Sequence, residues 1–171
     1  MKSPFRPSTS QNAGWNLAKT ALQTSVFWFI FLYVFPQLIL KMERELQWPS
    51  FSFSEWIAWL LLLVFSVLGV YSGYAMSRFG QGTPLPTDCA NELVVQGPYK
   101  IVRNPMAVAG IGQGISIGLI HGSWSVIVYA FAGAILWHIA VRPAEEADLK
   151  SRFGDAYILY KKQVKCWIPK L

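Results

Sequence analysis

Two long stretches of the chain carry no charged side chain, residues 21–40 and residues 56–76. At a helical rise of about 1.5 Å per residue, each stretch is long enough to cross the roughly 30 Å hydrocarbon core of a bilayer. The composition agrees, because 53% of the residues are hydrophobic and only 14% are charged, whereas soluble domains carry about 25% charged residues. The sequence therefore predicts an all-α integral membrane protein.

A second pair of apolar segments, residues 105–120 and 124–141, is separated only by the turn His121-Gly122-Ser123. So short a connection predicts a helical hairpin, whose first arm is short for a membrane span. Residues 144–164 mix apolar and charged side chains, which predicts an interfacial helix over the mouth of the hairpin, interrupted at Gly154. We expect about four transmembrane helices, with a C-terminal hairpin and a cytoplasmic interfacial helix that acts as a lid against water.

The distribution of basic residues predicts the orientation in the membrane. Four crossings place the N-terminus, the loop 77–104 and the C-terminal tail on one side, and every lysine and arginine except Lys41 and Arg44 falls there. The positive-inside rule assigns that side to the cytoplasm. The net charge of +6 is then explained by topology and by attraction to lipid headgroups, and no basic folded surface for nucleic acid is evident. We expect residues 1–20 to form a cytoplasmic segment and residues 21–171 one transmembrane domain.

Polar residues precede the first arm of the hairpin and follow the second arm, both on the predicted cytoplasmic side. Asn104 and Pro105 suit the N-cap and the first position of a helix. Arg103, just before them, either anchors the helix end among lipid headgroups or binds a ligand carboxylate, and the sequence leaves both roles open. Glu145 and Glu146 follow the second arm, where they either stabilise a helix N-terminus through its dipole or bind a cationic ligand.

Other features of the hairpin also allow two explanations. Glycines recur every four residues from Gly110 to Gly118, a spacing that lets membrane helices approach closely and that also leaves room for a flat ligand. His138 is ionisable and lies inside an apolar span, so it is a functional candidate unless a neighbouring helix satisfies it. Cys89 and Cys166 form no Cys-x-x-Cys pair, and we expect no metal site.

The order of these motifs resembles a known group of membrane enzymes. The motifs are Gly97-Pro98-Tyr99-Lys100-Ile101-Val102-Arg103-Asn104-Pro105, Glu145-Glu146 and Phe153-Gly154-Asp155-Ala156-Tyr157. They resemble the isoprenylcysteine carboxyl methyltransferase and phospholipid methyltransferase group, whose usual form is Gly-x-Tyr-x-x-x-Arg-His-Pro-x-Tyr-x-Gly, then Glu-Glu, then Phe-Gly-x-x-Tyr. The resemblance covers Gly82 to Leu171, about half of the chain.

The resemblance implies methyl transfer from S-adenosylmethionine to a hydrophobic or lipid-like acceptor, which is an isoprenylcysteine carboxylate, a phospholipid amine or a small thiol. It implies a multi-pass enzyme of the bacterial inner membrane, with a cofactor-binding core at residues 97–171. The implied catalytic residues are Arg103 and His138. The implied cofactor-binding residues are Tyr99, Arg103, Asn104, Gly110, Gly112, His138, Glu145 and Glu146.

The sequence also departs from the family pattern. Asn104 replaces the usual His, and Ala107 stands where a Tyr is usual, which implies altered specificity or lost activity. Lys165-Cys166-Trp167 stands in place of Pro-Arg-Trp. Two alternatives therefore stay open: a sterol-reductase-like enzyme that uses NADPH, and a non-enzymatic membrane scaffold. The short chain and the lack of a basic pocket for a 2′-phosphate count against the reductase.

Overall fold

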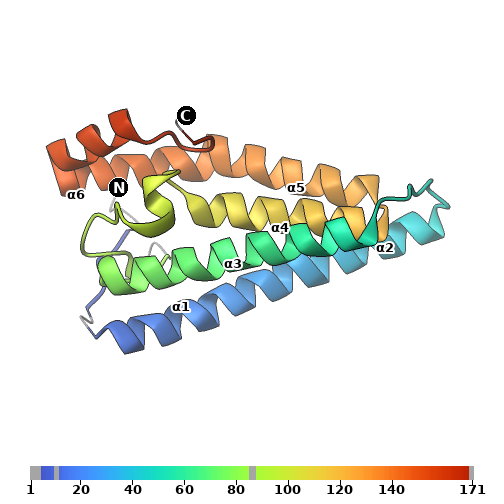
Figure 1. The fold of residues 1–171 in the computed structure, drawn as a ribbon, viewed down its shortest axis with the longest axis horizontal. Helices are drawn as coiled ribbons and strands as arrows, with labels where there is room; N and C mark the ends of the chain where they lie inside the picture. Colours follow the sequence, from blue (N-terminus) through green and yellow to red (C-terminus); the bar gives the residue numbers. More distant parts are fainter. Residues whose placement is uncertain (1–4, 10–11, 85–87, 170–171) are drawn as a thin grey trace.

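The computed structural model describes residues 5–9, 12–84 and 88–169. Helices account for the architecture, and the described residues pair as strands only at isolated bridges. Along the chain the helices are α1 (Ala13–Trp28), η1 (Phe29–Val34), α2 (Phe35–Glu45), α3 (Glu55–Phe79), η3 (Gly97–Lys100), α4 (Pro105–His121), α5 (Trp124–Leu136), η4 (Trp137–Val141) and α6 (Arg142–Gln163). The long helices run side by side along the longest axis of the molecule (Figure 1).

The predicted membrane architecture is confirmed. Three continuous helical segments are long and apolar enough to cross a bilayer, Ala13–Glu45, Glu55–Phe79 and Trp124–Gln163. The first arm of the hairpin, Pro105–His121, is apolar but shorter. The helices extend beyond the uncharged stretches because their polar flanks continue the same helical backbone on both sides of the apolar run.

One boundary differs from the sequence-based expectation. We expected the hairpin arm to end at residue 141 and a separate helix to cover residues 144–164, but α5 continues through η4 directly into α6. In η4 each hydrogen bond connects residues five apart in sequence, not four as in an α-helix, and the Arg142 N–H donates to the Trp137 carbonyl. A π-type turn of this kind redistributes the backbone carbonyls just before the proline, which has no N–H to donate. The helix that carries Glu145 and Glu146 is therefore a direct extension of the second hairpin arm.

The glycines of α4 allow close packing on two sides. A side chain at Gly112 would clash with the ring of Phe65 in α3. One at Gly114 would lie 3.0 Å from the Cβ of Ala130 in α5. Gly110 differs, because an added Cβ there meets no atom within 4 Å. The glycine spacing thus serves helix packing at most positions and leaves one face of the helix bare.

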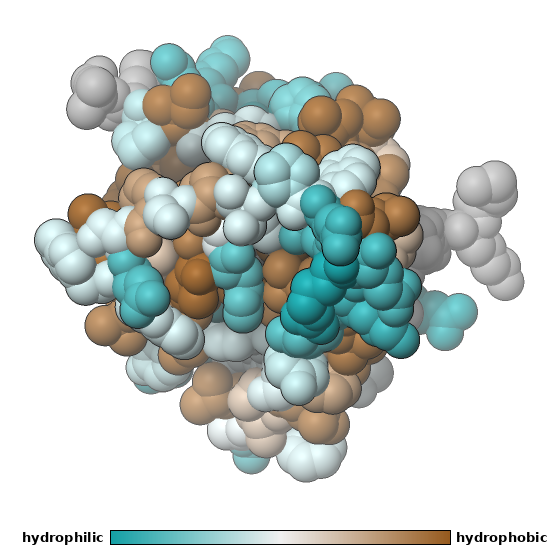
Figure 2. All heavy atoms as spheres, turned by 90° about the vertical axis from the view of Figure 1, so that its right-hand side faces the viewer, coloured by the Kyte–Doolittle hydropathy of each residue, from teal (hydrophilic) through white to brown (hydrophobic). Residues whose placement is uncertain are grey.

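The two ends of the bundle are built differently. Figure 2 views the end that carries α2, where hydrophilic residues gather on one side among hydrophobic ones. At the opposite end α6 bends at Gly154, whose φ of 50° and ψ of −125° lie outside the helical region. The turns after Gly154 fold back toward the hairpin (Figure 1), and they bury Tyr157 and Tyr160. The predicted interruption at Gly154 is therefore a bend that directs α6 over the cavity described next.

Candidate functional site

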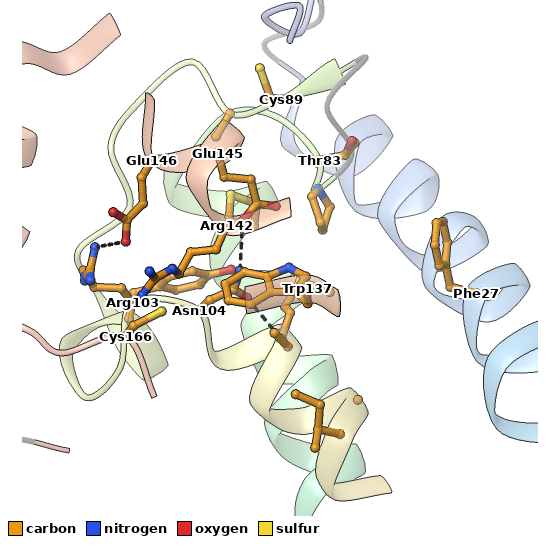
Figure 3. A pocket seen from close by; sticks show the side chains of 18 of the residues that line it. Phe27, Thr83, Cys89, Arg103, Asn104, Trp137, Arg142, Glu145, Glu146 and Cys166 are labelled. Carbon is orange, nitrogen blue, oxygen red and sulfur yellow. Dashed lines mark hydrogen bonds and ion pairs between the residues drawn. The ribbon is translucent and has the colours of Figure 1, made fainter. Parts of the chain in front are cut away.

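A cavity of about 680 Å³ lies at the end of the bundle where the loop before α4 meets α6. Its polar part is lined by Arg103 and Asn104 from the loop and by Glu145 and Glu146 from α6. Figure 3 shows these side chains converging from separate segments, with Phe27 of α1 on the far side. The cavity continues between α1 and α5, where apolar side chains line it. The cavity therefore joins a charged end to an apolar groove that lies between the membrane helices.

Arg103 is the centre of a hydrogen-bond network at the polar end. Its Nη1 donates to Glu146 Oε1 at 2.7 Å and to the Tyr157 hydroxyl at 3.1 Å. Lys161 forms an ion pair with the other Glu146 oxygen. The Arg103 and Glu146 side chains are only 11% and 17% exposed, so the pair is shielded from solvent and stronger than a surface pair.

The pKa values of this pair shift in opposite directions. Burial alone would raise the pKa of the Glu146 carboxyl, but hydrogen bonds from Lys161 and the charge of Arg103 lower it below its usual value. Burial would likewise lower the pKa of Arg103, and the neighbouring Glu146 raises it instead. Both groups are therefore held in their charged forms at neutral pH.

Asn104 connects the start of α4 to Glu145. Its side-chain oxygen accepts the Ala107 N–H at 3.0 Å, and its side-chain nitrogen donates to Glu145 Oε2 at 3.2 Å. The apolar part of the helix ends at Val141, so Glu145 lies outside the membrane-spanning segment. Burial raises the pKa of Glu145 to about 7, against the lowering effect of the Asn104 hydrogen bond. Two adjacent glutamates thus have different charge states near neutral pH.

Arg142 also lines the cavity, although it was not among the predicted site residues. Among the described residues, the Nε atoms of Arg103 and Arg142 are buried and have no hydrogen-bond partner. Leaving such a donor unsatisfied costs roughly 1–3 kcal/mol, and more for a charged group. The sequence spacing could have identified Arg142 as a site residue, because it lies one helical turn before Glu145 and Glu146. Two orphaned guanidinium donors indicate a place for an anionic ligand group.

Tyr99 and Gly110 line the cavity, and Gly112 does not. Tyr99 is 5% exposed, and its carbonyl accepts the Tyr160 hydroxyl at 2.7 Å. Burial, with smaller contributions from Tyr160 and Glu145, raises its pKa, so its own hydroxyl remains a proton donor. Gly112 faces Phe65 in the interface with α3, and we therefore leave it out of the candidate site.

His138 also lies outside the cavity lining. Its Nδ1 accepts the Trp167 indole N–H at 2.8 Å, and the Trp167 ring packs edge-on against Trp137 at 4.9 Å. The same C-terminal segment accepts the Arg103 backbone N–H at the Lys165 carbonyl, at 3.0 Å. His138 thus holds the segment that borders Arg103, and it does not join the other predicted site residues.

A strap from the N-terminal segment braces the loop above the cavity. Cys89 donates its N–H to the Arg6 carbonyl at 2.9 Å, and the Ser8 N–H bonds the Cys89 carbonyl at 3.0 Å. Arg152 of α6 donates to the Ala90 carbonyl at 2.6 Å. Residues 85–87 of this loop lie outside the described residues. The loop, α6 and the N-terminal segment therefore form one connected rim around the cavity.

Comparison with known proteins gives one family. The family model for phospholipid methyltransferase matches residues 53–156, which is more than half of the chain. The matched region runs from the start of α3 past Glu145 and Glu146 to the bend in α6. No curated protein matches the chain.

Proposed function

The chain belongs to the phospholipid methyltransferase family, and from this premise we propose that it transfers a methyl group from S-adenosylmethionine to a hydrophobic or lipid-like acceptor. The observation that carries the proposal is the convergence of Arg103, Asn104, Glu145 and Glu146 at one end of a cavity whose remainder is apolar. Charged and apolar halves of one cavity suit a polar methyl donor and an apolar methyl acceptor that must meet.

The polar end has the chemistry needed to hold the cofactor. S-Adenosylmethionine carries a positive sulfur, a positive amino group and a ribose diol, all of which carboxylates bind favourably. Glu145, oriented by Asn104, is the closest fit, because Glu146 is already paired with Arg103 and Lys161. The orphaned Nε atoms of Arg103 and Arg142 fit a carboxylate, either of the cofactor or of the acceptor.

The reaction needs alignment more than acid–base chemistry. When bound, S-adenosylmethionine would supply an activated methyl group and would leave as S-adenosylhomocysteine once the methyl group is transferred. The residues of the chain align the two reactants and exclude water. An acceptor carboxylate needs no general base, and Arg103 or Arg142 would orient it. An amine or thiol acceptor must lose a proton, and Glu145 replaces His138 as the candidate base because it lines the cavity.

We further propose the predicted orientation, with both termini in the cytoplasm of a bacterial inner membrane and residues 1–20 as a cytoplasmic segment. Cysteine labelling from outside the cell should reach Gln47→Cys and miss Lys100→Cys, whose native side chains lie at opposite ends of the bundle. Cys89 and Cys166 are buried, so they contribute little background. Labelling of Lys100→Cys alone would reverse the orientation and remove the site from cytosolic cofactor.

Two measurements test the methyltransferase proposal. S-Adenosylhomocysteine should raise the thermal stability of the purified protein, and NADPH should not. Membranes that contain the chain should transfer radiolabelled methyl groups into an organic extract. Arg103→Ala should strongly reduce the transfer, while Lys100→Ala, which removes an exposed charge outside the cavity lining, should preserve it. Stabilisation by NADPH would support the reductase, and stabilisation by neither ligand, without methyl transfer, would support the scaffold.

A further inference from the structure

The apolar groove ends at a contact between the first and the last membrane helices. The Tyr129 hydroxyl of α5 donates to the Phe31 carbonyl of η1 at 3.1 Å. The Tyr129 ring also packs edge-on against Phe35, with centroids 6.2 Å apart. Tyr129 and Phe31 line the cavity, whereas Phe35, beyond them, does not. The cavity lining therefore reaches Tyr129 and Phe31 and does not extend to Phe35, so this contact marks the end of the groove on the α5 side.

The backbone explains why the contact forms at this place. Phe35 donates its N–H to the Ile30 carbonyl, as in a π-helix. The next residue is Pro36, which has no N–H to donate. The Phe31 carbonyl would accept the Phe35 N–H in an α-helix and the N–H of residue 36 in a π-helix. The first is already bonded to Ile30, and the second does not exist. A carbonyl without a hydrogen-bond partner is costly in hydrocarbon. The Phe31 carbonyl in η1 is therefore a favourable acceptor for the Tyr129 hydroxyl.

The groove between the charged end and this closure has a definite length. Along the α5 side its lining runs from Tyr129 through Gly133 to Arg142, thirteen residues apart in sequence, which is about 20 Å at the helical rise. An added Cβ at Gly133 would meet no atom within 4 Å. On the α4 side the groove passes over Gly110 and Gly114. Gly110 and Gly133 leave open space along this groove, between bulkier lining side chains such as Phe27 and Leu136.

We propose that the Tyr129–Phe31 contact sets the longest apolar chain that the methyl acceptor can carry. The inference rests on the proposed function: the reacting head of the acceptor lies near Arg103 and Glu145, and one apolar chain lies in the groove between α1 and α5. The end of a chain of optimal length contacts the Tyr129 ring. A longer chain must displace that ring or leave the groove toward lipid, and either costs binding energy.

Two substitutions should move the limit in opposite directions. Tyr129→Ala removes the closure and should shift the preferred acceptor to longer chains. Gly133→Leu fills the groove one turn nearer the charged end and should shift the preference to shorter chains. Phe131→Ala is the matched control, because Phe131 lies on the same helix, is 53% exposed and does not line the cavity. Since one methylene in an apolar pocket is worth about tenfold in specificity, each shift should change the ratio of long-chain to short-chain rates by about tenfold.

The experiment measures methyl transfer to S-alkyl cysteines and to lysophosphatidylethanolamines of graded chain length, and thermal stabilisation by the same compounds. Opposite shifts for Tyr129→Ala and Gly133→Leu, with Phe131→Ala unchanged, would support the limit. An identical chain-length profile in the parent and both variants would overturn it while leaving the methyltransferase in place. No transfer to any compound would overturn the proposed function, and the stabilisation profiles would then still decide whether Tyr129 limits chain length.

Discussion

The polar groups at the two ends of the helical bundle differ in whether they are hydrogen-bonded within the protein. At the end that carries α2, Glu43 accepts the Ser125 N–H at 3.2 Å and Phe51 packs on Trp124 with centroids 4.4 Å apart. The polar groups there complete helix ends. At the opposite end Arg103 and Arg142 keep buried donors without partners. The first end therefore pairs its polar groups within the bundle, while the second leaves buried donors unpaired, as the proposed ligand site requires.

The largest effect should come from Gly122, at the α2 end. This residue has a φ of 61° in the turn of the hairpin, and an added side chain would clash with the Phe51 carbonyl. Left-handed backbone costs a non-glycine residue about 1–2 kcal/mol before any clash, so Gly122→Ala should lower the free energy of unfolding by about 3 kcal/mol or more. Thermal unfolding in detergent measures it.

Gly133→Ala is the control for that loss of stability. Gly133 lies inside α5, and the new Cβ would meet no atom within 4 Å, so this variant should be as stable as the parent or slightly more stable. Equal stability of Gly122→Ala and the parent would mean that the α2 end is looser than its contacts indicate, and the comparison between the two ends would fail.

The next effect concerns Arg103 and tests whether the site end serves ligands more than stability. Arg103→Ala removes a buried charge that pairs with Glu146 and that we propose binds a ligand carboxylate. Losing that ligand contact should cost about 2–4 kcal/mol of transition-state stabilisation, which is roughly 30- to 1,000-fold in kcat/KM. Lys161→Ala removes the other charge on Glu146, but Lys161 is 49% exposed and should cost much less activity. Equal losses in both variants would reduce the network to a structural ion pair.

The sequence predicted the bundle well because apolar length and charge asymmetry determine it directly. The hairpin and the bend at Gly154 follow from local patterns, and the hairpin in turn brings Arg103 and Glu146 to the same end of the bundle. Gly112 and His138 could not be placed, because which face of a helix meets a neighbour depends on packing. Gly112 proved to face Phe65, and His138 proved to bond Trp167. Roles of single residues within an apolar helix require the packing itself.

The third effect is a pH dependence carried by Glu145. Its pKa of about 7 means that the unliganded site holds a proton below that pH. A cationic ligand favours the carboxylate, so binding releases the proton and affinity should rise with pH and level off above about 7. Below it, the Kd for S-adenosylmethionine should increase by up to about tenfold per pH unit, measured by calorimetry. Glu145→Gln should bind more weakly with a flat profile, and an unchanged slope in that variant would assign the titration to another group.

The smallest effect returns to the α2 end and tests whether the two ends are independent. Glu43 places a carboxylate at the first turn of α5, where the helix dipole favours negative charge by about 0.3–1 kcal/mol. Glu43→Gln keeps an acceptor for the Ser125 N–H and loses only the charge, so the free energy of unfolding should fall within that range. Glu45→Gln should leave stability unchanged, because Glu45 is 65% exposed and its ion pair with Lys41 is long, at 3.9 Å. Methyl transfer should be unaffected by either substitution, since neither residue lines the cavity. A loss of activity in Glu43→Gln without a matching loss of stability would show that α5 transmits changes from one end to the other, and the α2 end could then no longer be treated as structural alone.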